Sequence, residues 1–264
     1  MLIRIYKIVF TLAVISFSFN QNCIDRVEVL LWDQCYNIES TAKLSLSGVG
    51  LSGKIPEEIG ELINLYILDL SNNRLSGEIP SSIGKLVNLK FLYLQDNELS
   101  GQIPSSIGEL VSLNRLFLSS NKISGSIPTV IGNLKNLEYL HLFKNKLSGQ
   151  IPIELGKLVN LFKLDLSLNQ LTGAIPYQLG GLTNLNSLRL FSNQLSGDIP
   201  LSIKNLLELE FLFLQNNQLS GQVPFQLCAY KKINMNMDGN MFCPPYPFCL
   251  SEDSIKSQLV LDCN

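Results

Sequence analysis

Histidine is the first residue type to consider, because it supports both metal binding and proton transfer near neutral pH. The sequence of 264 residues contains one histidine, His141. A multi-histidine metal site is therefore excluded, and we expect neither a Ser-His-Asp nor a Cys-His arrangement. A lone histidine is more often an exposed polar contact than a catalyst. The recurrent glycines belong to repeated turns rather than to a phosphate loop, so we predict no cofactor and no metal.

Paired carboxylates are the second candidate for chemistry. Asp69 and Asp165 stand at equivalent positions of a repeated segment, four repeats apart. If each repeat adds one strand to a sheet, the two carboxylates lie roughly 19 Å apart. The two carboxylates of glycosidases lie about 5 to 9.5 Å apart, so these two cannot act together. We predict that the protein is not an enzyme.

The repeated segment is most regular from Leu65 onwards, where it reads LYILDLSNNRLSGEIPSSIG. The same pattern returns from Leu89 and Leu113, and prolines recur every 24 residues from Pro56 to Pro224. A fixed period in this range is typical of a solenoid, in which each coil contacts only its neighbours. The repeat therefore predicts one elongated domain.

Each position of the repeat has a physical role. Leu68 and Leu70 alternate along a short strand, so both point to the same side. Gly77 allows a sharp turn, and Pro80 fixes φ where no ladder donor is needed. One asparagine per repeat is expected inside the turn, where its amide can pair backbone groups of its own coil and its neighbour. These residues are Asn73, Asn97, Asn121, Asn145, Asn169, Asn193 and Asn217.

This pattern resembles the plant-type leucine-rich repeat, LxxLxLxxNxLSGxIPxxLGxLxx, over residues 44–227. The resemblance implies an α/β solenoid: a right-handed superhelix with a concave parallel β-sheet, mostly β-structure and short 3-10 turns. It also implies a second sheet along the flank, built by the LSGxIP segments, and cysteine-containing caps at both ends. Proteins of this type include receptor-kinase ectodomains and inhibitors of polygalacturonases.

Residues that alternate with the inward leucines are expected on the concave surface. From Leu65 to Asn217, every Phe or Tyr except Tyr177 stands at such a position. Aromatic residues favour strands in general, but here the inward positions are nearly all leucine. The aromatic residues are therefore expected to face solvent, where large apolar patches mark interaction sites. The candidate ligand-binding residues are Tyr66, Asp69, Phe91, Tyr93, Arg115, Phe117, Tyr139, His141, Phe143, Lys163, Asp165, Arg189, Phe191, Phe211 and Phe213.

The first residues are typical of a signal peptide. Arg4 and Lys7 precede an apolar run of about a dozen residues, which is the expected length of a signal-peptide core. A membrane span needs about 20 apolar residues. We predict a signal peptide at residues 1–18, a secreted or cell-surface protein, and no transmembrane segment after cleavage. An uncleaved anchor is the alternative.

The sequence divides into an N-terminal cap at 19–43, a repeat array at 44–227 and a C-terminal cap at 228–264. The array comprises one degenerate coil and seven regular repeats. Met235, Met237, Asn240 and Phe242 predict a final coil with one residue missing. A cover at each open end of a solenoid hides leucines that would otherwise be exposed.

All six cysteines lie in the two caps, which is typical of an exported protein. Seven coils separate the caps by roughly 34 Å, too far for a disulfide between them. Cys23 should therefore pair with Cys35. The remaining cysteines allow three pairings, with a zinc site as the rival interpretation. They are Cys228, Cys243, Cys249 and Cys263.

The net charge and the glycosylation signals limit the classes of partner that we expect. The formal net charge is −2 and no basic patch is evident, so nucleic acid is not an expected partner. The chain has no Asn-x-Ser/Thr sequon. Its absence and the short caps favour a microbial secreted protein of this type, and we expect a monomer.

Three functions are compatible with these features. The leading hypothesis is a non-enzymatic module that recognises an extracellular protein, peptide or glycan on its concave face. A second is a secreted inhibitor that blocks the cleft of a cell-wall-degrading enzyme. A third is a structural or adhesive role at the cell surface, which predicts self-association or retention there.

The alternation of inward and outward residues can be tested at Leu116. We predict that Leu116→Ala lowers the free energy of unfolding by about 2–5 kcal/mol, because it leaves a cavity in the core. Chemical denaturation followed by circular dichroism measures the change. A negligible loss would contradict the inward assignment.

Overall fold

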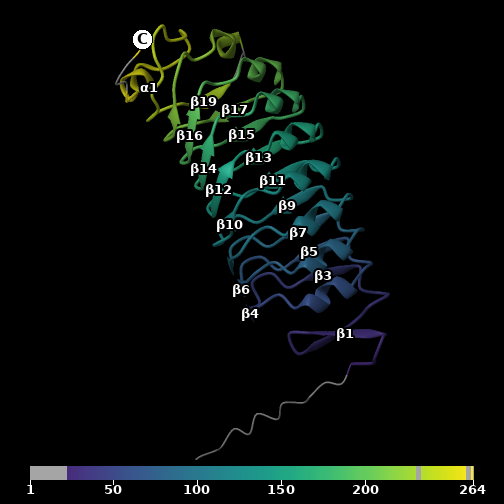
Figure 1. Ribbon diagram of the computed structural model, residues 1–264. Helices are drawn as coiled ribbons and strands as arrows, with labels where there is room; N and C mark the ends of the chain where they lie inside the picture. The colour runs from purple at the N-terminus through teal and green to yellow at the C-terminus, as the bar shows by residue number, and fades with distance from the viewer. Residues whose placement is uncertain (1–22, 230–232, 260–262, 264) are drawn as a thin grey trace, which may run out of the picture.

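The structure is a computed structural model that describes residues 23–229, 233–259 and 263, so the predicted signal peptide at 1–18 lies outside the described residues. These residues form one elongated stack of coils, with the N-terminal hairpin at one end and α1 (Glu252–Lys256) at the other (Figure 1). The predicted fold class, a leucine-rich-repeat solenoid, is confirmed.

One face of the stack is a parallel sheet to which each coil adds one three-residue strand. Equivalent residues are aligned across it, so that Leu68, Leu92 and Leu116 are partners on successive strands. The nine strands found in the described chain are, in spatial order, β19 (Asn234–Asn236), β17 (Phe211–Phe213), β15 (Ser187–Arg189), β13 (Lys163–Asp165), β11 (Tyr139–His141), β9 (Arg115–Phe117), β7 (Phe91–Tyr93), β5 (Ile67–Asp69) and β3 (Lys43–Ser45).

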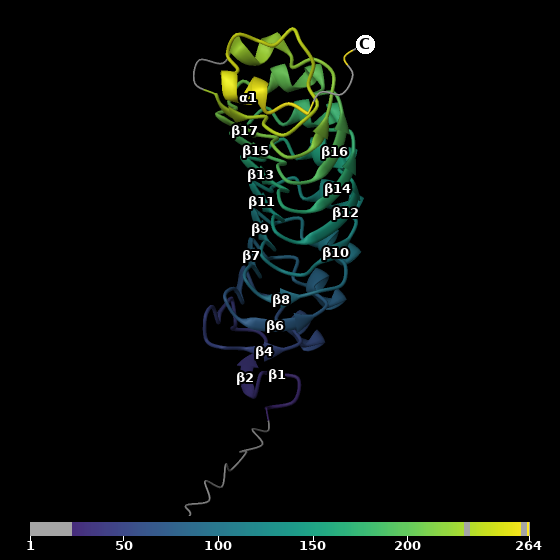
Figure 2. The same cartoon turned by 90° about the vertical axis from the view of Figure 1, so that its left-hand side faces the viewer.

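The LSGxIP segments form strands along the flank, as Figure 2 shows, but among the described residues these strands make two sheets of three and five strands instead of the single second sheet expected. Gly77 ends such a strand with φ of 78°, a conformation that residues with a side chain rarely adopt. The flank strands fall into two groups. They are β4 (Ser52–Gly53), β6 (Arg74–Gly77) and β8 (Glu98–Leu99), and then β10 (Ser124–Gly125), β12 (Lys146–Gln150), β14 (Gln170–Gly173), β16 (Gln194–Gly197) and β18 (Gln218–Leu219).

The convex side carries short 3-10 helices, each following a proline of the repeat. Pro80, for example, precedes η2 with φ of −65° and ψ of 144°, which ends the flank strand and begins the helical turn. The helices are η1 (Glu57–Glu61), η2 (Ser81–Lys85), η3 (Ser105–Glu109), η4 (Thr129–Asn133), η5 (Ile153–Lys157), η6 (Tyr177–Gly181), η7 (Leu201–Asn205) and η8 (Phe225–Ala229).

The core lies between these three surfaces and consists almost entirely of leucine and isoleucine. Leu92, Leu116 and Leu140 on successive strands are fully buried, and so are Ile107 and Ile131 of the convex helices. Because a coil is only a few residues wide, each core residue packs against the same position in the next coil. The stack therefore stabilises itself through repeated nearest-neighbour contacts.

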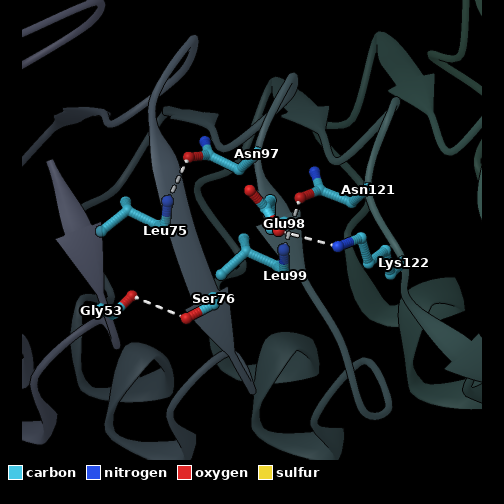
Figure 3. Close-up of polar contacts among 8 residues, drawn as sticks. All are labelled: Gly53, Leu75, Ser76, Asn97, Glu98, Leu99, Asn121 and Lys122. Carbon is cyan, nitrogen blue, oxygen red and sulfur yellow. Dashed lines mark hydrogen bonds and ion pairs between the residues drawn. The ribbon is translucent and has the colours of Figure 1, made fainter. Parts of the chain in front are cut away.

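The asparagine column joins neighbouring coils through their backbones. Asn97 accepts a hydrogen bond from the Leu75 amide at 3.0 Å, and Asn121 accepts one from the Leu99 amide at 3.0 Å (Figure 3). The Nδ2 group of Asn97 also donates to the Leu70 carbonyl of the preceding coil at 2.9 Å. Each side chain thus pairs backbone groups that would otherwise be buried without partners.

The final coil keeps the asparagine hydrogen bonds although it is one residue shorter. Asn240 follows Asn217 by 23 residues instead of 24. It still accepts from the Leu219 amide and donates to the Leu214 carbonyl, at 3.1 and 3.0 Å. The fully buried Phe242 fills the core beneath this coil.

Disulfides stabilise both caps. At the N-terminal end an antiparallel hairpin of β1 (Glu28–Leu31) and β2 (Gln34–Asn37) covers the first coil. The structure pairs Cys23 with Cys35 at this end. For the four C-terminal cysteines it adopts one of the three arrangements that the sequence left open. The two C-terminal disulfides are Cys228–Cys249 and Cys243–Cys263.

The asparagine column yields a test of what holds the coils together. Asn169 pairs the Leu147 amide and the carbonyls of Leu142 and Leu166 in a buried setting. Because each backbone group left unpaired costs about 1–3 kcal/mol, Asn169→Ala should lower the free energy of unfolding by about 3 kcal/mol or more. Guanidinium denaturation measures this loss.

The matched control is Asn88→Ala, whose side chain donates a single exposed hydrogen bond to the Ile63 carbonyl. This variant should lose less than about 1 kcal/mol, since water replaces an exposed partner. Equal losses for the two variants would argue against a special role for the asparagine column.

Candidate functional site

The sheet register places the candidate residues in columns on one surface. One column runs through Phe91, Arg115 and Tyr139, and the adjacent column runs through Tyr93, Phe117 and His141. Neighbouring strands of a sheet lie about 4.8 Å apart, so large side chains in successive coils must touch. The site follows from placing bulky residues in consecutive coils.

Most of the candidate residues on the middle strands form one continuous group, which we call the central cluster. Its members are half-buried against one another, except for the more exposed Phe162 at one edge. Every member has a ring or cation contact with another. The central cluster comprises Phe91, Tyr93, Arg115, Phe117, Tyr139, His141, Phe143, Phe162 and Lys163.

Ring stacking holds the central cluster in a defined shape. The Phe117 and His141 rings stack with centroids 4.3 Å apart and planes 6° from parallel. Tyr93 meets Phe117 edge to face at 5.2 Å, and Tyr139 meets Phe162 in the same way at 5.9 Å. Such contacts stabilise aromatic pairs by about 0.5–1.5 kcal/mol beyond the area they bury. These contacts hold the side chains of the central cluster in one arrangement.

Arg115 lies at the centre of the cluster between two aromatic rings. Its guanidinium carbon is 4.9 Å from the Tyr139 ring centroid and 5.5 Å from that of Phe91. Its Nη1 donates to the Tyr93 hydroxyl at 3.5 Å, while its Nε is buried without a hydrogen-bond partner among the described residues. The described residues also place no carboxylate in an ion pair with it. Among the described residues, the positive charge of Arg115 is therefore compensated by two rings and one hydroxyl oxygen but by no carboxylate.

The environment of His141 favours its neutral form. Burial is the main cause, and it lowers the pKa of His141 below the ordinary value of 6.5; the rings of Phe117, Tyr139 and Phe143 contact the imidazole. The Asp165 carboxylate raises the pKa, whereas the Lys163 and Arg189 charges lower it further. His141 therefore contributes an uncharged ring with one donor and one acceptor nitrogen at neutral pH.

Other candidate residues lie outside the central cluster. Arg189 stands 5.3 Å from the Phe213 centroid, and Phe211 meets Phe213 at 6.2 Å, so these three form a separate group. Tyr66 and Phe191 have no ring contact with another described residue. They remain on the same surface as isolated positions.

The two aspartates are committed to their own turns. The Asp69 carboxylate accepts hydrogen bonds from the Ser71 hydroxyl and amide, at 2.6 and 3.1 Å. Asp165 does the same with Ser167. Each aspartate therefore fixes the end of its strand, and less of its carboxylate is available to a ligand than the sequence pattern suggested.

A cleft along the edge where the strands begin was not among the sequence-based candidates. It has a volume of about 470 Å³ and adjoins the central cluster, with which it shares Tyr139 and Phe162. The position of Phe162 in the repeat matches that of Tyr66, so the sequence pattern could have identified it. We call this feature the edge cleft. Its lining residues are Asn114, Asn136, Glu138, Tyr139, Asn160, Phe162 and Asn184.

Two other surface features differ from the central cluster. A larger hollow of about 1160 Å³ follows the flank of the first coils, but serine, proline and glycine dominate its lining and no aromatic residue contributes. On the convex side, Ile153, Tyr177, Leu201 and Phe225 begin four successive 3-10 helices and are each at least half exposed. In the described part of the chain, none of the helices is long and apolar enough to cross a bilayer.

Comparison with family models identifies the repeat. A leucine-rich repeat region matches residues 42–125, and further leucine-rich repeats match residues 136–158, 160–182, 184–206 and 208–229. The chain belongs to the leucine-rich repeat family. The comparison with curated proteins found no match.

Solved structures of plant proteins are similar to this chain. The peptide hormone receptor RGFR1, solved with RGF2, is 41% identical over 73% of this chain and 31% of the receptor chain, with a TM-score of 0.72. The Arabidopsis receptor kinase HAESA, solved with the peptide hormone IDA and the co-receptor SERK1, is 40% identical over 76% and 34%, with a TM-score of 0.72.

A plant ice-binding protein is 31% identical over 78% of this chain and 66% of that one, with a TM-score of 0.68. The chain spans about a third of the length of the two receptors. The likeness to receptor ectodomains and the three disulfides indicate an extracellular protein.

Because His141 is the only histidine, its titration can be followed without ambiguity by NMR. We expect a pKa below 6.5 in the folded protein, and an upward shift toward 6.5 in Phe117→Ala, which exposes the ring. The folded state then binds this proton less readily than the unfolded state does. The contribution of His141 to the free energy of unfolding therefore decreases as the pH falls below about 6.5, where the unfolded state takes up the proton first. A pKa at or above 6.5 would show that burial does not dominate.

Proposed function

We propose that the protein is a non-enzymatic extracellular binding module whose central cluster recognises a polypeptide ligand. The observation that carries this proposal is the Arg115 guanidinium, held between the Phe91 and Tyr139 rings without a carboxylate partner. Binding sites with this composition are common, because aromatic residues and arginine contribute most of the affinity at protein interfaces.

The chemistry of the central cluster suits a peptide segment. Flat rings such as Phe117 and Tyr93 offer apolar area at low entropic cost, since their stacking already fixes them. Arg115 offers donors to a backbone carbonyl or an acidic side chain of the ligand. A ligand lying over these coils would contact several strands at once, and a rigid solenoid would not have to reorganise to bind it.

The similar proteins support a polypeptide ligand. HAESA was solved with the peptide hormone IDA, and the peptide hormone receptor RGFR1 was solved in complex with RGF2. This chain covers only about a third of either receptor, so their ligands and co-receptor are not transferred to it. What supports the proposal is the shared repeat type together with an aromatic and cationic face on this chain.

The two other hypotheses predict different partners. An inhibitor of a cell-wall-degrading enzyme would use the same face but would require a folded enzyme rather than a short peptide. A structural or adhesive protein would bind its own copies or remain at the cell surface. Both alternatives can be tested with the same purified protein, by enzyme inhibition assays and by sedimentation analysis.

Selection from a random peptide display library against the immobilised mature protein tests the proposal. We predict that selected peptides bind Tyr93→Ala/Phe117→Ala more weakly by about 2 kcal/mol or more, a loss typical of central aromatic contacts. The control is Ile153→Ala/Tyr177→Ala, which removes a similar exposed apolar area from the convex side. Circular dichroism verifies the fold of both variants.

Equal binding by the wild type and the concave variant would place the site elsewhere. Loss of binding in the convex control alone would point to the stripe of exposed apolar residues on the 3-10 helices. Failure to select any peptide, together with inhibition of an added polygalacturonase, would favour the inhibitor hypothesis instead.

A further inference from the structure

We propose that the edge cleft is a second binding site, and that it takes a neutral carbohydrate chain. The cleft lies at the start of strands β9 to β15, beside the central cluster. Its lining combines amide oxygens, one carboxylate and two aromatic rings. Sugars with equatorial hydroxyl groups are bound by such a combination, because they present C–H faces to rings and hydroxyl donors at their rim.

The amide oxygens of the cleft form a row of hydrogen-bond acceptors. The Nδ2 groups of Asn136, Asn160 and Asn184 donate to backbone carbonyls of the preceding coil, at 2.9 Å in each case. These bonds fix the orientation of each amide and direct its donor side into the protein. The Oδ1 atoms have no hydrogen-bond partner among the described residues, and all three side chains are exposed. The cleft therefore presents acceptors to a ligand.

The spacing of this row suits a polymer. Equivalent residues on neighbouring strands repeat at about 4.8 Å, which is close to the length of one sugar ring. A chain that follows the solenoid axis could donate one hydroxyl group to each coil it crosses. Asn88 makes the same kind of hydrogen bond to the preceding coil, so this use of asparagine recurs along the edge.

Two aromatic rings in contact distinguish this part of the edge, since Tyr66, at the equivalent position of an earlier coil, has no ring contact with another described residue. Phe162 is 38% exposed, and its ring meets Tyr139 edge to face at 5.9 Å. The edge-to-face contact stabilises Phe162 while leaving ring surface toward solvent. An exposed phenylalanine held in this way gains by stacking against an apolar C–H face. The Tyr139 hydroxyl adds a group that can donate or accept.

The charge of the cleft argues for a neutral ligand. Glu138 is exposed and has no ion pair with a described residue, so it adds two acceptor oxygens and a negative charge. The Lys135 ammonium on the same edge donates to the Gly132 and Lys157 carbonyls, at 2.7 and 3.3 Å. The Lys163 ammonium is 6.0 Å from the Phe162 ring centroid but does not line the cleft, so an anionic sugar in the cleft would meet carboxylate and amide oxygens where it needs donors. A hydroxyl-rich neutral chain finds acceptors instead.

Sedimentation of the full mature protein with insoluble cellulose, chitin and xylan tests this inference, and polygalacturonate gel is the anionic comparison. We expect retention on at least one neutral polysaccharide. Phe162→Ala should weaken that retention at least tenfold, and Asn160→Ala should weaken it by removing one acceptor oxygen from the row. The control Tyr177→Ala removes an exposed ring from the convex side and should bind as the wild type does.

Three results would overturn the inference: no retention on any neutral polysaccharide, retention unchanged in Phe162→Ala, or stronger retention on polygalacturonate than on the neutral chains. If Phe162→Ala were misfolded by circular dichroism, Glu138→Lys at an exposed position would replace it, with the same expected loss. The variant Tyr93→Ala/Phe117→Ala should keep carbohydrate binding, so this site and the proposed peptide site can fail independently.

Discussion

The structure depends on one requirement: a coil only a few residues wide must pair its buried backbone groups with the coil on either side. The asparagine column meets this requirement. Each amide accepts from one coil and donates to another, as Asn97 does with the Leu75 amide and the Leu70 carbonyl. Leucines fill the narrow space that remains, and the column continues into the shorter final coil through Asn240. The residues that stabilise the stack therefore hardly differ from one repeat to the next, because a polar group left unpaired in this interior would lower the free energy of unfolding.

The proposed function correspondingly rests on positions that differ from one repeat to the next. On the concave strands, the residues between the inward leucines contribute to neither the leucine core nor the asparagine column, although Asp69 and Asp165 fix the ends of their strands. Aromatic side chains become a preorganised surface only where successive coils supply them, as Tyr93, Phe117 and His141 do. Tyr66, just before β5, has no ring contact with another described residue. In such a repeat protein, each coil contributes one or two residues to a surface that extends along the axis of the solenoid.

The period, the inward leucines and the turn asparagines could be predicted because each obeys a rule that repeats with the sequence. Site details could not, because they depend on contacts between non-equivalent positions. Asp69 reads as a charged concave residue, yet Ser71 two positions later engages its carboxylate. The edge cleft joins residues on both sides of the first leucine of the repeat, such as Asn160 and Phe162, which a column-by-column analysis separates. The C-terminal disulfides follow from the path of an irregular cap, for which no repeat supplies a register.

Ligand-induced change at the single histidine tests the central claim most directly, because His141 lies inside the central cluster and stacks on Phe117. A peptide selected on the protein would be titrated into a sample labelled at histidine, while the ring resonances are followed by NMR. Binding at the central cluster predicts shifts of these resonances that saturate at the same ligand concentration as an independent affinity measurement. Saturated binding with unmoved His141 resonances would contradict the account and place the ligand on another surface.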